Sequence, residues 1–107
     1  MIESDQKASR VNGGVRRGAR TIVAEPVELS NLGRSWSPET TSTHNISTEG
    51  ARVTTQRAWE PGSLLLLKSL RGDFWARGRV IYWRSFSSSR ASIGVEFIVK
   101  GGHWARG

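Results

Sequence analysis

Short runs of apolar and β-branched residues, each closed by a turn signal, recur roughly every ten residues along this chain, a pattern typical of short strands. No long amphipathic helical stretch interrupts them, and such spacing is typical of a small all-β barrel or sandwich. The chain has 107 residues, enough for one domain of ordinary size and too few for two. The runs that predict strands are residues 21–29, 50–55, 63–70, 74–83 and 91–99.

The remaining segments are predicted to connect or flank these strands. Residues 1–15 are polar and glycine-rich and indicate a flexible N-terminal arm, and residues 100–107 indicate a short tail without a substantial helix. We therefore expect a folded domain over residues 16–99. Residues 30–43 are rich in Ser and Thr and are expected to form a loop with a short strand near its end. Pro26 interrupts the first predicted strand and suggests an edge position or a bulge there.

The charge of the chain points to an anionic partner. Its 16 Lys and Arg residues against 9 Asp and Glu residues give a formal net charge of +7, and nearly all of the cations are Arg. A guanidinium group can grip a phosphate or a guanine edge with two parallel hydrogen bonds, which an ammonium group cannot do. Nucleotides, nucleic acids and anionic membrane surfaces all fit such a chain.

Several classes of protein are disfavoured by what the sequence lacks. There is no Cys, and the two His residues, His44 and His103, are far apart, so we expect no metal site. No nucleophile elbow, phosphate loop or paired carboxylates stand out, and we expect neither catalytic residues nor a cofactor. The longest purely apolar run, residues 64–67, is too short for membrane insertion, and the N-terminus lacks a signal-peptide core, so a cytoplasmic location is expected.

The first candidate binding motif is Arg16-x-x-x-Arg20. Two guanidinium groups at this spacing, beside Gly18, can converge on one small anion, one on a phosphate and the other on the O6/N7 edge of a guanine. Read alone, the motif also fits a solvated basic arm or one that contacts nucleic acid without sequence preference.

The second candidate motif is Asn45-x-Ser47-x-x-Gly50. Asn45 and Ser47 can point the same way at the entrance to a strand, while Ile46 points oppositely into the core. Gly50 permits a turn or the close approach of a ligand. Read alone, the motif also fits an ordinary β-turn.

The two motifs in this order, followed by Gly94 to Phe97 in the last strand, resemble the PilZ family over about residues 16–99. The resemblance implies a six-stranded antiparallel β-barrel of the split-barrel type that binds cyclic di-GMP. It also implies that Arg16 and Arg20 hold phosphates and guanine edges, and that Asn45 and Ser47 hydrogen-bond the ligand beside Gly50. Arg17 and His44 are further candidates, although His44 also fits a cap of the turn.

The resemblance also bears on stoichiometry and partners. An Arg just before the first motif favours a stacked ligand pair in this family, and Val15 at that position favours one bound molecule. We expect a monomer or weak homodimer that signals to an effector protein. A small barrel that binds nucleic acid and a PilZ-like interaction module without ligand are the alternatives. The five tryptophans divide into two groups. Three are expected in the core or at the barrel rim (Trp59, Trp75 and Trp83), and two lie in loops and can be exposed (Trp36 and Trp104).

Overall fold

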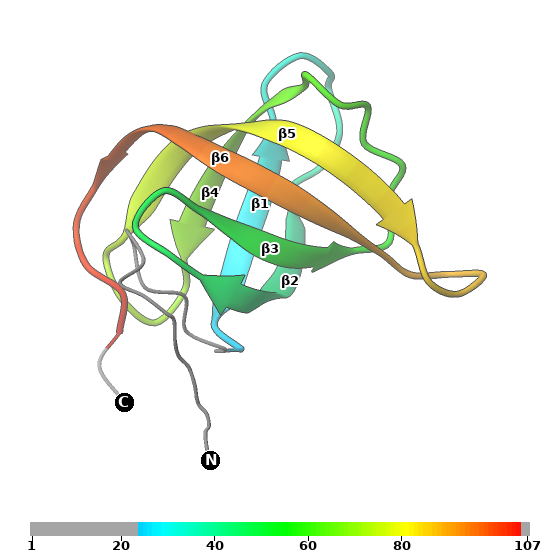
Figure 1. The fold of residues 1–107 in the computed structure, drawn as a ribbon. Helices are drawn as coiled ribbons and strands as arrows, with labels where there is room; N and C mark the ends of the chain where they lie inside the picture. The colour runs from blue at the N-terminus through cyan, green and yellow to red at the C-terminus, as the bar shows by residue number, and fades with distance from the viewer. Residues whose placement is uncertain (1–23, 106–107) are drawn as a thin grey trace, which may run out of the picture.

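The computed structural model describes residues 24–105, which form a closed barrel of six antiparallel strands (Figure 1). The order around the barrel is β1-β2-β3-β6-β5-β4, and pairing of β1 with β4 closes the ring. The predicted all-β fold class is confirmed, and no helix occurs among the described residues. None of them therefore forms a helix long and apolar enough to cross a membrane. The strands are β1 (Pro26–Asn31), β2 (Glu39–Ile46), β3 (Gly50–Thr55), β4 (Leu64–Ser69), β5 (Trp75–Ser85) and β6 (Ala91–Gly101).

The core lies inside the barrel and is built from alternate residues of the strands. In β4, Leu65 and Leu67 point inward and are fully buried, while Leu64 and Lys68 point outward and are exposed. Val27 and Leu29 of β1 meet them from the neighbouring strand. Burial of each such side chain contributes about 1.5–3 kcal/mol, so the period-two pattern fixes which face of each strand is inside.

Aromatic residues close the two ends of the barrel. Before β4 begins, Trp59 is buried and packs edge-on against Trp36, with 5.2 Å between the ring centroids. After β4 ends, Phe74 stacks on Trp104 with centroids 4.2 Å apart. Trp59 is thus in the core as predicted, whereas the two loop tryptophans are partly buried against the core instead of exposed.

The structure corrects three expectations about strands. Pro26 is the first residue of β1 in a closed barrel, and its carbonyl accepts a hydrogen bond from the Leu70 amide at 3.0 Å. It therefore needs no free sheet edge. The short strand expected near the end of residues 30–43 is present but longer than expected, because β2 begins at Glu39, runs to Ile46 and pairs with both β1 and β3. Trp75 and Trp83 are each 39% exposed and are not core residues, and Trp75 lies on the outer face of β5 because it alternates with buried Ala76.

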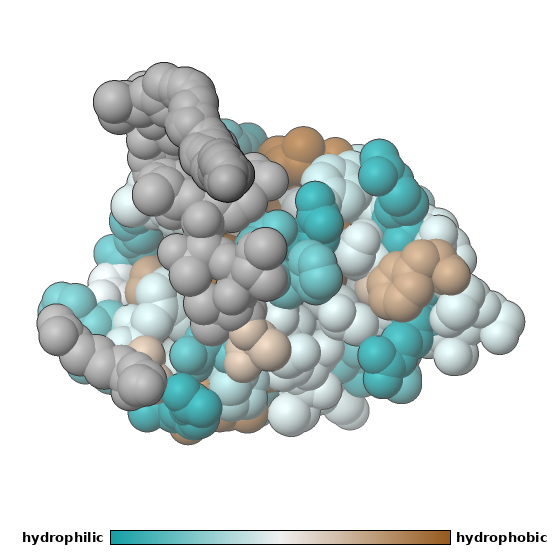
Figure 2. Space-filling view, turned by 60° about the horizontal axis from the view of Figure 1, so that its bottom comes forward, coloured by the Kyte–Doolittle hydropathy of each residue, from teal (hydrophilic) through white to brown (hydrophobic). Residues whose placement is uncertain are grey.

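The outer surface is mixed in character. On the face that Figure 2 draws, small apolar patches are separated by hydrophilic side chains. Single exposed apolar residues are normal on a protein surface, so only a contiguous group of them has meaning for function.

Candidate functional site

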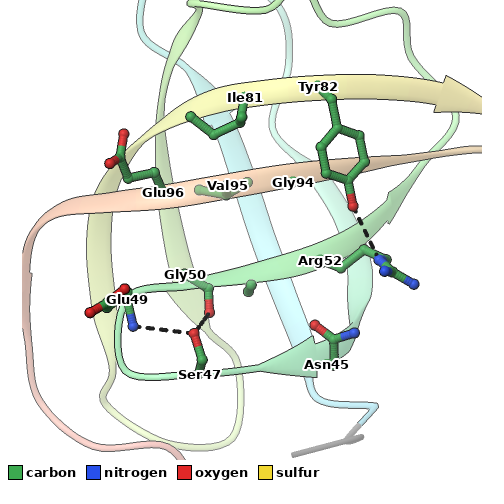
Figure 3. Close-up of a pocket in the computed structure, with 11 residues that line it drawn as sticks. Asn45, Ser47, Glu49, Gly50, Arg52, Ile81, Tyr82, Gly94, Val95 and Glu96 are labelled. Carbon is green, nitrogen blue, oxygen red and sulfur yellow. Dashed lines mark hydrogen bonds between the residues drawn. The ribbon is translucent and has the colours of Figure 1, made fainter. Parts of the chain in front are cut away.

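The Asn45–Gly50 motif forms the hairpin turn between β2 and β3 (Figure 3). The Ser47 amide donates to the Gly50 carbonyl at 2.9 Å. The Ser47 hydroxyl accepts from the Glu49 amide at 3.2 Å and donates to the Gly50 carbonyl at 3.3 Å. The motif is therefore a turn, as one interpretation of the sequence held, and the turn fixes the position of its own polar groups.

A β-bulge sets the direction of the side chains that enter this turn. Thr43 pairs with Val53 but Asn45 pairs with Arg52, which leaves His44 as the extra residue, exposed and within β2. His44 therefore does not cap the turn. Ile46, which pairs with Ala51, packs against the core, so Asn45 lies on the opposite, outer face, as predicted.

Asn45, Ser47 and Gly50 line a pocket of about 300 Å³ on the outside of the barrel (Figure 3). Residues of β5 and β6 form its other wall, because β6 pairs with β3 and β5 follows β6 in the sheet. Although it lies on the outer face, Asn45 is only 8% exposed. The further lining residues are Glu49, Ala51, Arg52, Ile81, Tyr82, Gly94, Val95 and Glu96.

Gly50 is required for a different reason from the one that the sequence suggested. A Cβ atom at Gly50 would lie 2.1 Å from the Val95 carbonyl oxygen of β6. The absent side chain therefore lets β3 and β6 approach each other, and the space that it frees is filled by backbone instead of being open to a ligand.

Two residues of the pocket that the sequence analysis did not single out are coupled across three strands. Tyr82 of β5 lies against Gly94 of β6, where a Cβ atom would be 2.2 Å from the tyrosine ring. Its hydroxyl accepts a hydrogen bond at 3.1 Å from Nε of Arg52 in β3. The guanidinium group of Arg84 lies 5.4 Å from the centre of the same ring. The outward register of Arg52 was readable from the alternation in residues 50–55, but its partner was not.

The chain enters the barrel directly beside this site. Glu25, just before β1, donates its amide to Oγ1 of Thr43 at 2.9 Å, and its carbonyl accepts from the Thr43 amide at 2.9 Å. Its buried carboxylate forms an ion pair with Arg71 at 3.4 Å. Glu25 is thus fixed against Thr43, which lies two residues before Asn45 in β2.

Arg16, Arg17 and Arg20 lie outside the described residues, so only the entry point of their segment is known. The pocket wall itself carries one guanidinium group, Arg52, and two carboxylates, Glu49 and Glu96. In residues 24–105 no group of three side chains could hold a metal ion.

A second cavity, of about 450 Å³, lies on the other side of the hairpin turn. Ser47 borders both cavities, but the second is walled mainly by Ile46 and aromatic rings, including Phe97 and Trp104. Lys100 at its border donates to the carbonyl of Thr48. This cavity suits apolar groups better than a nucleotide.

Comparison with known proteins identifies relatives of this barrel. A sequence model described as the PilZ domain matches residues 15–101. The structure of the inhibitor of motility MotI/DgrA from Bacillus subtilis is similar with a TM-score of 0.62 and 15% identity, over 80% of this chain and 44% of that one. This chain thus spans less than half the length of that protein. The PilZ domain of CeSA from a cellulose-synthesizing bacterium is similar with a TM-score of 0.56 and 20% identity, over 76% and 82% of the two chains. No curated protein matches the sequence.

Proposed function

The chain belongs to the PilZ domain family, a family of cyclic di-GMP receptors, and from this premise we propose that it binds cyclic di-GMP with Arg16, Arg20, Asn45 and Ser47. One observation carries the proposal: Asn45 and Ser47 line an outer pocket beside the point where the segment with both arginines joins the barrel. Gly50 completes the turn, and Arg17 and His44 are secondary candidates.

The length of the connecting chain supports this arrangement. Four residues lie between Arg20 and Glu25, and an extended chain spans at most about 18 Å over the resulting five Cα–Cα steps. Glu25 is hydrogen-bonded to Thr43, two residues from Asn45. Arg20 is therefore within reach of the pocket.

The charge of the pocket supports a contribution from the arm. Cyclic di-GMP carries two phosphate charges, whereas the pocket wall offers one cation and two carboxylates. A volume of about 300 Å³ is also at the small end of ligand pockets. Both observations favour a site of two parts, in which Arg16 and Arg20 supply the cations and cover the ligand from outside.

In this proposal the protein is a cytoplasmic receptor without chemistry of its own. Ligand binding draws the Arg16–Arg20 segment over the hairpin turn, an order–disorder switch that changes the surface read by an effector protein. Val15 before the motif favours one bound molecule. We expect this switch to operate in a monomer or a weak homodimer.

Isothermal titration calorimetry with cyclic di-GMP tests the proposal. We expect micromolar or tighter binding by the wild type and its loss in Arg20→Ala. Asn45→Ala should weaken binding, while Arg90→Ala, which removes a charge from the loop between β5 and β6, should leave it unchanged. No heat at millimolar ligand, or equal losses in Arg20→Ala and Arg90→Ala, would contradict a defined site.

Binding of nucleic acid is the competing outcome. It predicts gel-shift binding of oligonucleotides with a steep salt dependence that Asn45→Ala does not change. Trp36 and Trp104 are partly buried against the core, which leaves less of each ring open for stacking on bases.

A further inference from the structure

The sheet register builds a second distinct surface on the outside of β4, β5 and β6. Leu66, Arg77 and Val99 lie opposite one another across the three strands. The next row places Lys68 and Trp75 beside Gly101. We call this surface, made of Leu64, Leu66, Lys68, Trp75, Arg77 and Val99, the β4–β6 face.

Arg77 at the centre of this face has apolar neighbours instead of a counter-ion. Its cross-strand partners are Leu66 and Val99, and Trp75 is two residues away on the same outer side of β5. The other two cations nearby have carboxylates opposite them: Arg79 pairs with Glu96 at 3.9 Å, and Lys68 lies opposite Glu28. Within residues 24–105 the Arg77 side chain makes no hydrogen bond or ion pair.

The aromatic part of the face, the indole of Trp75, occupies the space that the missing side chain of Gly101 leaves free. A Cβ atom at Gly101 would lie 2.7 Å from Nε1 of Trp75, so the indole lies directly over the β6 backbone. Trp75 is nevertheless 39% exposed, and Leu64 and Val99 are 40% and 44% exposed. Trp and Arg are both among the residues enriched at the hot spots of protein interfaces, and this face presents one of each side by side.

We propose that the β4–β6 face docks a protein partner that presents a carboxylate to Arg77 and an apolar side chain to Trp75 and Val99. Charge complementarity favours this occupant, because the described residues place no carboxylate opposite Arg77 and a carboxylate of the partner would supply one. A second copy of the chain is disfavoured, since a symmetric contact would place two Arg77 groups together. The surface does not depend on the proposed ligand.

A displayed library of random twelve-residue peptides tests this proposal. Selection on the wild type, with counter-selection on Arg77→Glu, should enrich peptides that combine Asp or Glu with an aromatic or aliphatic residue. A selected peptide should shift the NMR amide signals of β4, β5 and β6, and its affinity should fall at least about tenfold in Arg77→Glu and in Trp75→Ala.

The matched control is Arg90→Glu, which reverses a charge away from this face and should keep the affinity. Retention of the fold in each variant is checked by the dispersion of its NMR amide signals. Failure to enrich such peptides, or shifts confined to other strands, overturns the proposal. So does dimerisation in sedimentation velocity that Arg77→Glu abolishes, which assigns the face to a second copy. Binding to phosphatidylglycerol vesicles that Arg77→Glu abolishes overturns it in favour of a membrane.

Discussion

Glu25 and Arg71 form an ion pair, and we expect removal of Arg71 to destabilise the protein more than neutralisation of Glu25 does. The Glu25 side chain is 7% exposed and that of Arg71 is 53% exposed, with Nη2 and Oε2 3.4 Å apart. The second carboxylate oxygen of Glu25, Oε1, is buried without a hydrogen-bond partner. Removal of Arg71 leaves this charge buried and uncompensated, whereas neutralisation of Glu25 removes the charge itself.

The separation of 3.4 Å between Arg71 and Glu25 sets the size of the expected loss of stability. Coulomb's law at this separation gives about 5 kcal/mol at an effective dielectric constant of about 20 and about 1 kcal/mol in bulk water. Because Arg71 is more than half exposed, solvent screening lowers the useful value toward the range of a hydrogen bond to a charged group, about 1.5–3 kcal/mol. We expect Arg71→Met to cost about 2 kcal/mol of unfolding free energy and Glu25→Gln about 1 kcal/mol or less.

Urea unfolding at pH 7, monitored by tryptophan fluorescence, measures the change in unfolding free energy for both variants. In the double variant, the Arg71→Met change should cost much less than it costs alone, since the buried charge is already gone. The reasoning is refuted if Glu25→Gln is as destabilising as Arg71→Met, or if the two changes are additive. Glu25→Gln should also leave the affinity for cyclic di-GMP intact, because the bonds from the Glu25 backbone to Thr43 remain.

Two further predictions concern the hairpin and the core. Gly50→Ala should cost about 1–3 kcal/mol of unfolding free energy, because the new methyl group meets the Val95 carbonyl and β3 must move from β6. Thr55→Val should cost about 1–3 kcal/mol, since the buried Thr55 hydroxyl accepts from Nε1 of Trp59 at 3.2 Å and donates to Glu39 at 2.7 Å. Urea unfolding measures both.

Each of these variants has a matched control. Gly33→Ala adds a methyl group that meets only the Asn31 side chain at 3.6 Å, and should change stability by less than about 0.5 kcal/mol. Thr40→Val makes the same chemical change as Thr55→Val at an exposed position of β2. A Gly50→Ala protein as stable as Gly33→Ala would show that β3 and β6 tolerate separation. Equal effects of the two Thr variants would mean that the Thr55 bonds contribute little.

The sequence was sufficient for the parts of the fold that local patterns control. The short length of residues 63–70 and the turn signals on both sides of them predicted β4, in which Leu65 and Leu67 are fully buried inside the barrel. The turn at Asn45–Gly50 and the opposite direction of Ile46 were likewise predicted, because turn chemistry and strand period act over a few residues.

The parts that the sequence did not reveal depend on pairing between distant strands. β2 has a polar sequence, ETTSTHNI, and is a strand because β1 and β3 pair with both of its edges. The contact of Arg52 with Tyr82 joins residues 30 positions apart and requires the gap at Gly94 between them. Trp75 is exposed because its neighbour Ala76 takes the inward-facing position of β5, and the composition of the strand does not show which of the two faces inward.

The entry of the chain at Glu25 near the second motif, by contrast, follows from the antiparallel pairing of β1 with β2. In an antiparallel hairpin, the segment before the first strand and the segment after the second lie at the same end. The Arg16–Arg20 motif precedes β1 and the Asn45–Gly50 motif begins at the end of β2. Pairing of Pro26 with Ser42, and the bonds of Glu25 to Thr43, bring their connections together. Once β1 and β2 pair, the order of the two motifs along the chain therefore limits how far the Arg16–Arg20 motif can lie from the Asn45–Gly50 motif. A change that disrupts this pairing should weaken ligand binding even when all four proposed ligand-binding side chains are intact.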